Sequence, residues 1–251
     1  MRRLLEIAAA LLCLAGLPAG EALAVPASAM FGTAEIRAES HDELPQWGRV
    51  VREVAREEAT YAACAAEATA AGGGAAGGGA VDGRAACASV PALRDWSRLL
   101  ARLAREPRRE QLRAVNLFVN RWPYRPDQDT YGRRDHWATP LEFFANSGDC
   151  EDYAIAKYVS LRRLGVPAGD LRMVVLQDTS RGIAHAVLVA RATAGSDWLV
   201  LDNLSDKVLR QRDLPHYVPY YSVNETTRWA HVPPADAAVV TGGLAEAGGQ
   251  E

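Results

Sequence analysis

The sequence predicts an α+β fold in which a helical N-terminal half precedes a cysteine-bearing helix packed on an antiparallel sheet. Three observations support this prediction. Apolar residues recur at helical spacing through the first half of the chain. A further helical pattern begins at Cys150, after a long irregular stretch. Three short runs rich in β-branched residues then follow one another, and this order of elements is typical of α+β domains.

Length and charge limit the classes of protein to which the chain can belong. It has 251 residues, 49% of them hydrophobic, and a net charge of −3. This length fits one globular domain, or at most two small ones. A nucleic-acid-binding protein would carry a basic stripe, so we expect no nucleic-acid partner.

The first 24 residues have the pattern of a signal peptide. Two arginines precede an apolar run from Leu4 to Leu17, and a small-residue cleavage motif follows. An uncleaved anchor is the alternative, but the run is shorter than the roughly 20 residues that span a bilayer. We therefore expect a mature domain over residues 25–232 that does not insert into a membrane, and a flexible tail over residues 233–251.

Cys64 and Cys87 flank a Gly/Ala-rich insertion, about residues 70–83, that cannot pack a core of its own. We predict that they form a disulfide, which would contribute about 3 kcal/mol by closing this loop. Two buried free thiols are the alternative. Under the disulfide interpretation Cys150 is the left-over thiol of the mature chain.

The remaining elements follow from periodicity and from turn signals. Helices are expected over Trp47–Ala68, Pro91–Arg105, Arg109–Trp122 and Cys150–Leu164, the last of which stops at Gly165. Strands are expected over Leu171–Gln177, Ala184–Arg191 and Trp198–Asn203. The segment from Pro123 to the cysteine-bearing helix is long and irregular, and segments of this kind are often functional.

The hairpin between the last two strands brings His185 and Asp202 to the same face of the sheet. A two-residue turn centred between Thr193 and Ala194 pairs them directly, and a turn centred one residue later makes them diagonal neighbours. A lone histidine on an apolar face is more often a core residue than a catalyst. Asp202, however, ends an apolar strand where a carboxylate needs a role, and orienting a histidine is such a role.

Cys150, His185 and Asp202 together supply the three parts of a nucleophilic site. A cysteine nucleophile needs a base to form its thiolate, and the base needs a third group to fix its tautomer. Cys150 also begins a helix, where the macrodipole favours a thiolate. These three residues are the predicted catalytic residues.

The acids beside Cys150 oppose this role. Asp149, Glu151 and Asp152 surround it, and one carboxylate about 4 Å away repels a thiolate by roughly 4 kcal/mol at an effective dielectric near 20. Two interpretations remain open on charge alone. The acids hold a calcium ion, with further oxygens from Asp127, Asp129, Asp135 or backbone carbonyls, or they cap the helix N-terminus.

Long stretches of the sequence resemble a known family. The segments "DHWATPLEFFANSGDCEDYAIAKY", "AHAVLVA" and "LVLDN" are similar to the bacterial transglutaminase-like cysteine proteinases, and the likeness runs from about Trp96 to Trp229. The resemblance implies a papain/transglutaminase-like core that hydrolyses peptides. It assigns Cys150 as nucleophile, His185 as base and Asp202 as the orienting acid. Calcium dependence in the family favours Asp149, Glu151 and Asp152 as metal ligands.

The LapG-type members of this family suggest the biological setting. They imply a periplasmic protease that cuts a large repeat adhesin near paired alanines and thereby disperses biofilm. They also imply an inner-membrane cyclic-di-GMP receptor that sequesters this protease. The Gly/Ala-rich insertion is peculiar to this chain. A transglutaminase, which shares the thioester step, and a non-catalytic calcium-binding module remain the alternatives. Trp137 is a candidate second oxyanion donor, although a packing role is the simpler assignment.

Overall fold

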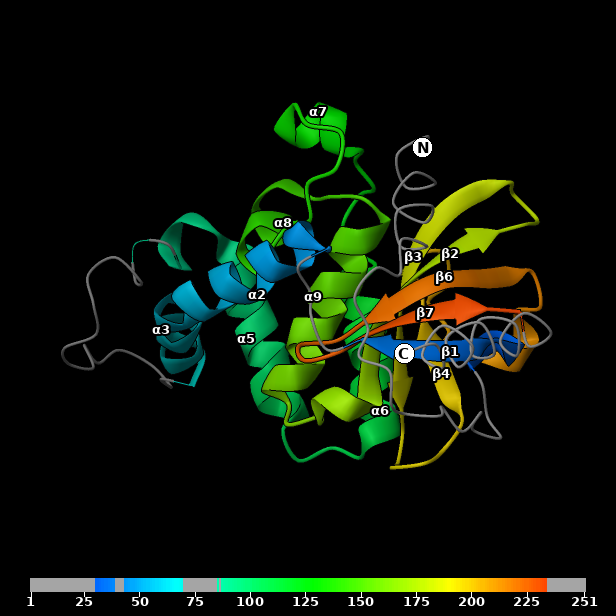
Figure 1. Cartoon of the computed structure of the whole chain (residues 1–251). Coiled ribbons are helices and arrows are strands. Elements are labelled where there is room, and N and C mark those ends of the chain that lie inside the picture. Colours follow the sequence, from blue (N-terminus) through cyan, green and yellow to red (C-terminus); the bar gives the residue numbers. More distant parts are fainter. Residues whose placement is uncertain (1–29, 39–42, 70–84, 86, 234–251) are drawn as a thin grey trace, which may run out of the picture.

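The computed structural model describes residues 30–38, 43–69, 85 and 87–233. The predicted signal peptide and Gly/Ala-rich insertion lie outside these residues, as does the predicted tail except for its first residue, Pro233. In Figure 1 the helices gather on one side of the molecule and the strands on the other. None of the helices within the described ranges has both the length and the hydropathy that crossing a bilayer requires.

The helical half contains seven of the α-helices that the structure describes. They are α2 (Pro45–Arg56), α3 (Glu58–Thr69), α5 (Pro91–Leu103), α6 (Arg108–Val119), α7 (Asp127–Tyr131), α8 (Pro140–Asn146) and α9 (Cys150–Arg163). Proline opens α2, α5 and α8, at the helical position where its missing N–H costs no hydrogen bond. α9 ends as predicted, because Gly165 adopts φ 83° just beyond it.

The prediction of one continuous helix over Trp47–Ala68 is wrong, since the structure has two helices, α2 and α3, separated at Glu57. The Glu57 side chain accepts a hydrogen bond from Thr139 Oγ1 at 2.8 Å and another from the Tyr61 hydroxyl. The contact with Thr139 joins segments 82 residues apart. Periodicity is a local signal and therefore does not reveal it.

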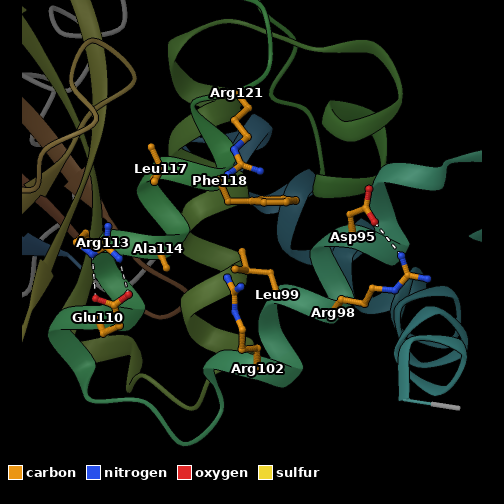
Figure 2. A pocket seen from close by; sticks show the side chains of 10 residues that line it. All are labelled: Asp95, Arg98, Leu99, Arg102, Glu110, Arg113, Ala114, Leu117, Phe118 and Arg121. Carbon is orange, nitrogen blue, oxygen red and sulfur yellow. Dashed lines mark hydrogen bonds and ion pairs between the residues drawn. The ribbon is translucent and has the colours of Figure 1, made fainter. Parts of the chain in front are cut away.

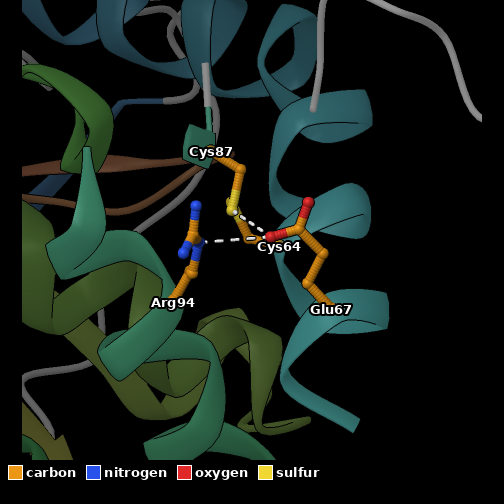
Figure 3. The surroundings of a disulfide bond; sticks show 4 residues. All are labelled: Cys64, Glu67, Cys87 and Arg94. Atoms are coloured by element: carbon orange, nitrogen blue, oxygen red, sulfur yellow. Dashed lines mark hydrogen bonds and ion pairs between the residues drawn. A yellow bond between two sulfur atoms is a disulfide. The ribbon is translucent and has the colours of Figure 1, made fainter. Parts of the chain in front are cut away.

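Cys64 and Cys87 form a disulfide with their Cα atoms 5.5 Å apart, which confirms the predicted pairing. Figure 3 shows it between α3 and the chain that leads into α5, beside the ion pair of Arg94 and Glu67, whose Nε and Oε2 lie 3.2 Å apart. The bridge thus holds α3 against α5 at the two ends of the insertion.

The strands form one antiparallel sheet in the order β1-β7-β6-β2-β3-β4-β5. They are β1 (Ala34–Ala38), β2 (Leu171–Asp178), β3 (Ile183–Arg191), β4 (Trp198–Leu201), β5 (Leu209–Arg210), β6 (Tyr217–Val223) and β7 (Arg228–Val232). The three predicted strands are β2, β3 and β4. β1 was not predicted, and it pairs with β7 from the far end of the described chain, as Figure 1 shows in blue and orange-red.

α9 is the central helix of the fold. Its residues from Cys150 to Leu161 are all buried, as expected for a helix that is covered on every side. α6 and α8 cover it on one side, and strands β2 and β3 cover it on the other. Alternate sheet residues face two cores: Val175 and Leu188 join the core that contains α9, whereas Val174 and Val187 join a second core on the opposite face. The nucleophile candidate therefore begins a rigid, enclosed element.

Candidate functional site

The chain enters α9 through a tightly constrained turn. Ser147 adopts φ 70°, a left-handed conformation that is uncommon for a residue with a side chain. Gly148 follows it, and a Cβ at this position would lie 2.0 Å from Asp152 Oδ2. The Gly148 carbonyl accepts a hydrogen bond from Arg125 N at 2.8 Å, which ties the turn to the irregular segment. Cys150 is thereby fixed at the first position of the helix.

Cys150 is the free cysteine among the described residues, and its side chain is 8% exposed. The thiol donates to Glu151 Oε2 at 3.1 Å. Burial raises the pKa of Cys150 well above its usual value, and the charges of Glu151 and Asp149 raise it further, whereas a hydrogen bond from the Ala186 backbone lowers it. These interactions therefore favour the neutral thiol over the thiolate.

His185 and Asp202 form a buried pair. His185 Nε2 lies 2.9 Å from Asp202 Oδ1, and both side chains are less than 5% exposed. Val189 of β3 pairs with Val200 of β4, so His185 and Asp202 are diagonal neighbours, as predicted for the later of the two turn centres. With the Nε2–H donating to Asp202, the Nδ1 atom carries the free lone pair.

Further donors hold the Asp202 carboxylate in its charged form. The Tyr217 hydroxyl donates to Asp202 Oδ2 at 2.6 Å, and Leu204 N donates to Oδ1 at 3.0 Å. Burial raises the pKa of Asp202, but the hydrogen bond and charge of His185, with these two donors, bring it below its ordinary value. Tyr217 was not among the residues predicted for the site.

The structure brings the thiol to the strand that carries His185 but does not join the two side chains. The Ala186 backbone, next to His185 in β3, contacts the sulfur, whereas the thiol proton is directed to Glu151. Among the residues described, no Cys150–His185 hydrogen bond is present. The three predicted catalytic residues thus share one region, with the thiol turned toward the acidic cluster.

The acidic cluster extends beyond the three predicted metal ligands. Two sets of carboxylates each place their oxygens within 4.8 Å of one another: Asp127, Asp135 and Glu151, and Asp127, Asp149 and Asp152. The irregular segment thus contributes Asp127 and Asp135, two of the three further acids named from the sequence. Asp129, the third, belongs to neither set.

Two observations show that this cluster fits a hard cation such as calcium. The Oδ1 atoms of Asp127 and Asp149 are buried and have no hydrogen-bond partner within the described chain. Burial raises the pKa of Asp127 to about 7, that of Asp149 to about 9 and that of Glu151 to about 7, and neighbouring carboxylates add to each shift. Oxygen ligands of this kind suit calcium, whose charge would offset the repulsion.

The helix-capping interpretation also holds for Asp152. Its Oδ1 accepts from Ala138 N at 2.6 Å, and its Oδ2 accepts from Asp149 N at 3.1 Å. The two interpretations of the acids are therefore compatible. Asp152 accepts from Asp149 N at the start of α9 and from Ala138 N ahead of α8, while Asp127 and Asp149 keep buried oxygens free.

Trp137 does not offer a free donor. Its indole N–H donates to Asp135 Oδ1 at 2.9 Å, and its ring contacts Trp47 with the centroids 6.4 Å apart. The structure therefore favours the packing role over the oxyanion role.

A groove of about 400 Å³ lies elsewhere, between α5 and α6. Figure 2 shows its lining: an apolar floor that includes Leu99 and Phe118, and a rim that includes Arg102 and Arg121. It contains none of the predicted site residues. This groove is therefore not the candidate catalytic site, which we assign to the region around Cys150.

The chain is similar to proteins of known class. Residues 93–237 match the family model for the bacterial transglutaminase-like cysteine proteinase, BTLCP. Calcium-bound LapG of Legionella pneumophila is 36% identical over 56% of this chain and 78% of its own, with a TM-score of 0.52. EGTA-treated LapG of the same organism is 31% identical over 68% of this chain and 84% of its own, with a TM-score of 0.54.

A third LapG structure from Legionella pneumophila is 28% identical over 73% of this chain and 97% of its own, with a TM-score of 0.55. None of the curated proteins matches. The family model covers more than half of the chain, and the mixed helix-and-sheet fold agrees with it. The chain belongs to the bacterial transglutaminase-like cysteine proteinase family.

Proposed function

We propose that this chain is a calcium-dependent cysteine endopeptidase in which Cys150 is the nucleophile, His185 the base and Asp202 the orienting acid. The observation that carries the proposal is the buried pair of His185 and Asp202, whose Nε2 and Oδ1 atoms lie 2.9 Å apart, with His185 on the strand that borders the Cys150 sulfur. Family membership supports the reaction class.

The geometry suggests how the proton moves. The thiol turns from Glu151 to His185 Nδ1, which takes its proton, and the sulfur bonds to the carbonyl carbon of the peptide. The imidazolium then gives this proton to the amide nitrogen as the C–N bond breaks, and a thioester remains. His185 next takes a proton from water, whose oxygen attacks the thioester, and the sulfur leaves and is reprotonated. Backbone N–H groups at the start of α9 would hold the oxyanion.

Calcium belongs to the proposal because of the acidic cluster and the relatives. One of the similar LapG structures is calcium-bound, and another is EGTA-treated. Asp127, Asp149 and Asp152, with Asp135 and Glu151 beside them, would hold the ion here. When bound, the ion supplies the positive charge that offsets carboxylate repulsion next to the sulfur.

We further propose a periplasmic protease that cuts the N-terminal region of a large repeat adhesin near paired alanines, disperses biofilm, and is sequestered by an inner-membrane cyclic-di-GMP receptor. The family resemblance and the signal-peptide pattern support this setting. The Cys64–Cys87 disulfide also supports it, because structural disulfides persist in oxidising compartments.

The test uses the purified mature protein with an adhesin N-terminal fragment that carries paired alanines. Intact-mass analysis should show two products in calcium, none in EGTA and none with Cys150→Ala. A labelled amine is included in the same reaction. Stable incorporation of the amine without chain cleavage would replace the protease assignment by a transglutaminase, and full biological activity of Cys150→Ala would replace it by a non-catalytic module.

A further inference from the structure

The helix α2 reaches the acidic cluster from outside the segment that matches the family model. That segment spans residues 93–237, whereas α2 ends before it. Trp47 anchors the helix, because its buried indole donates to the Asn224 carbonyl at 2.8 Å and its ring contacts that of Tyr158 in α9, with the centroids 5.3 Å apart. The first turn of α2 is therefore fixed relative to the helix that Cys150 begins.

Gln46, in this first turn, contacts one acid of the cluster directly. Its Nε2 atom donates to Asp135 Oδ2 at 2.8 Å, between residues 89 positions apart in the sequence. The other oxygen of this carboxylate, Oδ1, accepts from the indole N–H of Trp137 at 2.9 Å. The terminal torsion of an aspartate is broad, so a carboxylate without such partners rotates easily. Two donors, one on each oxygen, fix the plane of the Asp135 carboxylate.

The orientation of Asp135 matters because its carboxylate belongs to the acidic cluster. One of its oxygens lies within 4.8 Å of one oxygen each of Asp127 and Glu151. Asp127 is 2% exposed, and its Oδ2 accepts from His136 N, whereas its Oδ1 has no hydrogen-bond partner within the described chain. A buried oxygen without a donor, beside two other carboxylates, is the kind of group that a hard cation satisfies.

The amide of Gln46 suits the task of orienting a metal ligand because it is neutral. A cation in its place would pair with Asp135 and compete with a metal ion, whereas an amide N–H leaves the negative charge available. Arg49 lies one turn along the same face of α2. It forms an ion pair with Glu142, with Nη2 and Oε2 3.3 Å apart, and donates to the Trp137 carbonyl. The neutral donor of α2 thus meets the cluster, and the charged one meets the chain that follows it.

We propose that Gln46 is a positioning residue for calcium, which, together with Trp137, holds the Asp135 carboxylate in the orientation that lets it bind the ion with Asp127 and Glu151. The proposal rests on the calcium requirement of the proposed function. Loss of a side chain that hydrogen-bonds a metal ligand typically weakens metal binding by about 10–100-fold. The contribution of Gln46 should therefore appear in the affinity for calcium, and not only in the stability of the fold.

The first test measures calcium binding to the full mature chain by isothermal titration calorimetry, after removal of calcium with EGTA and without any substrate. Gln46→Ala removes the donor to Asp135. Gln128→Ala is the matched control, because Gln128 is exposed and follows Asp127 in α7. We expect the dissociation constant for calcium to rise about tenfold in Gln46→Ala and to stay unchanged in Gln128→Ala. Equal affinities of Gln46→Ala and the wild type would overturn the proposal.

A second variant separates this positioning role from a merely structural one. Gln46→Lys keeps an N–H donor at this position but adds a positive charge beside the acids. Thermal unfolding in EGTA should therefore occur at no lower temperature than in the wild type, while the dissociation constant for calcium rises about tenfold or more. Calcium binding by Gln46→Lys as tight as that of the wild type would overturn the proposal. This variant also decides the matter if Gln46→Ala does not fold.

These readouts distinguish this proposal from the proposed function. If the wild type binds calcium but cleaves no peptide, the protease assignment fails while the comparison of the Gln46 variants still stands. If the wild type cleaves peptide in calcium but Gln46→Ala binds calcium equally well, only the role of Gln46 is withdrawn. A wild type that binds no calcium would overturn both the calcium requirement and the role of Gln46.

Discussion

Individual residues fix the geometry around the thiol, and at Gly148 there is no room for a side chain. A Cβ at Gly148 would lie 2.0 Å from Asp152 Oδ2, and Asp152 is fully buried and bonded to two backbone N–H groups. We expect Gly148→Ala to lower the free energy of unfolding by about 1–3 kcal/mol, the usual effect of overpacking. Urea denaturation measures this change.

Gly169→Ala is the matched control for this variant. Nothing lies within 4 Å of the position that its Cβ would take, and its backbone conformation is open to other residues. A Gly148→Ala protein as stable as Gly169→Ala would show that Asp152 moves without cost, and the tight entry into α9 would then not constrain Cys150.

Tyr217 provides a second test at the level of one atom. Tyr217→Phe removes the hydroxyl that donates to Asp202 Oδ2 at 2.6 Å. We expect the loss to cost about 1–3 kcal/mol, because a buried carboxylate oxygen is left without its donor. The pKa of Asp202 should also rise, since the lost hydrogen bond favoured its charged form.

Unfolding measured between pH 3 and 7 checks this prediction. The lowered pKa of Asp202 contributes stability that is present above its unfolded pKa and is lost as the pH falls through its folded pKa. Tyr217→Phe should reduce this contribution. Tyr220→Phe is the control, because the Tyr220 hydroxyl donates to Gln177 Oε1 instead. Equal acid sensitivity of the two variants would contradict the assigned role of Tyr217.

Some residues of the site can be predicted from the sequence and others cannot. His185 and Asp202 follow from hairpin arithmetic, because strand pairing is regular once the turn is known. Asp127 and Asp135 were expected as further oxygen donors together with Asp129, but the irregular segment has no period from which to calculate that Asp129 lies outside the cluster. Tyr217 begins β6, which β2 and β3 separate from β4, and its contact with Asp202 therefore depends on a strand that the sequence did not reveal.

Secondary-structure elements were predictable where one pattern dominates. β2, β3 and β4 contain short apolar runs bounded by turn residues, and α9 has a clear stop signal. β6 carries Pro219 and mixed aromatic residues, and β1 lies far in sequence from its partner β7, so neither gives a local strand signal. Long-range pairing decides both of these strands.

Burial of the acidic cluster by the surrounding elements predicts that, without calcium, the stability of the protein depends on pH in an unusual direction. Asp127, Asp149 and Glu151 have folded pKa values of about 7, 9 and 7, above those of unfolded carboxyls. In EGTA the folded protein therefore binds more protons than the unfolded chain, and its stability should fall as the pH rises from 5 to 8. Calcium should stabilise the protein more at pH 8 than at pH 5.

Thermal unfolding in EGTA and in calcium at several pH values checks this expectation. Asp127→Asn should weaken the pH dependence in EGTA and reduce the stabilisation by calcium. Asp129→Asn is the control, because Asp129 lies on the same helix, α7, outside both carboxylate sets. Stability in EGTA that increases toward pH 8 would contradict the electrostatic description of the cluster.

At the scale of the whole molecule, the disulfide connects two parts of the helical half, away from the proposed catalytic residues. Cys64 lies in α3, and Cys87 precedes α5, so the bridge acts on the helical layer rather than on the sheet with His185. We expect Cys64→Ser/Cys87→Ser to lower the free energy of unfolding by about 2–4 kcal/mol. The rate of Cys150 alkylation at 25 °C should stay the same, because the contacts of the sulfur are with Glu151 and Ala186.

Intact-mass measurement after alkylation checks the disulfide, because it counts the free thiols of each protein. The oxidised mature wild type should take up one iodoacetamide, Cys150→Ala none, and the reduced, unfolded wild type three, because Cys64, Cys87 and Cys150 are the cysteines beyond the predicted signal peptide. If Cys150 is alkylated much more slowly in the double-serine variant than in the wild type, loss of the disulfide changes the position of α9. The enclosed position of α9 between α6, α8 and the sheet argues against this result, since its contacts there do not involve the bridge.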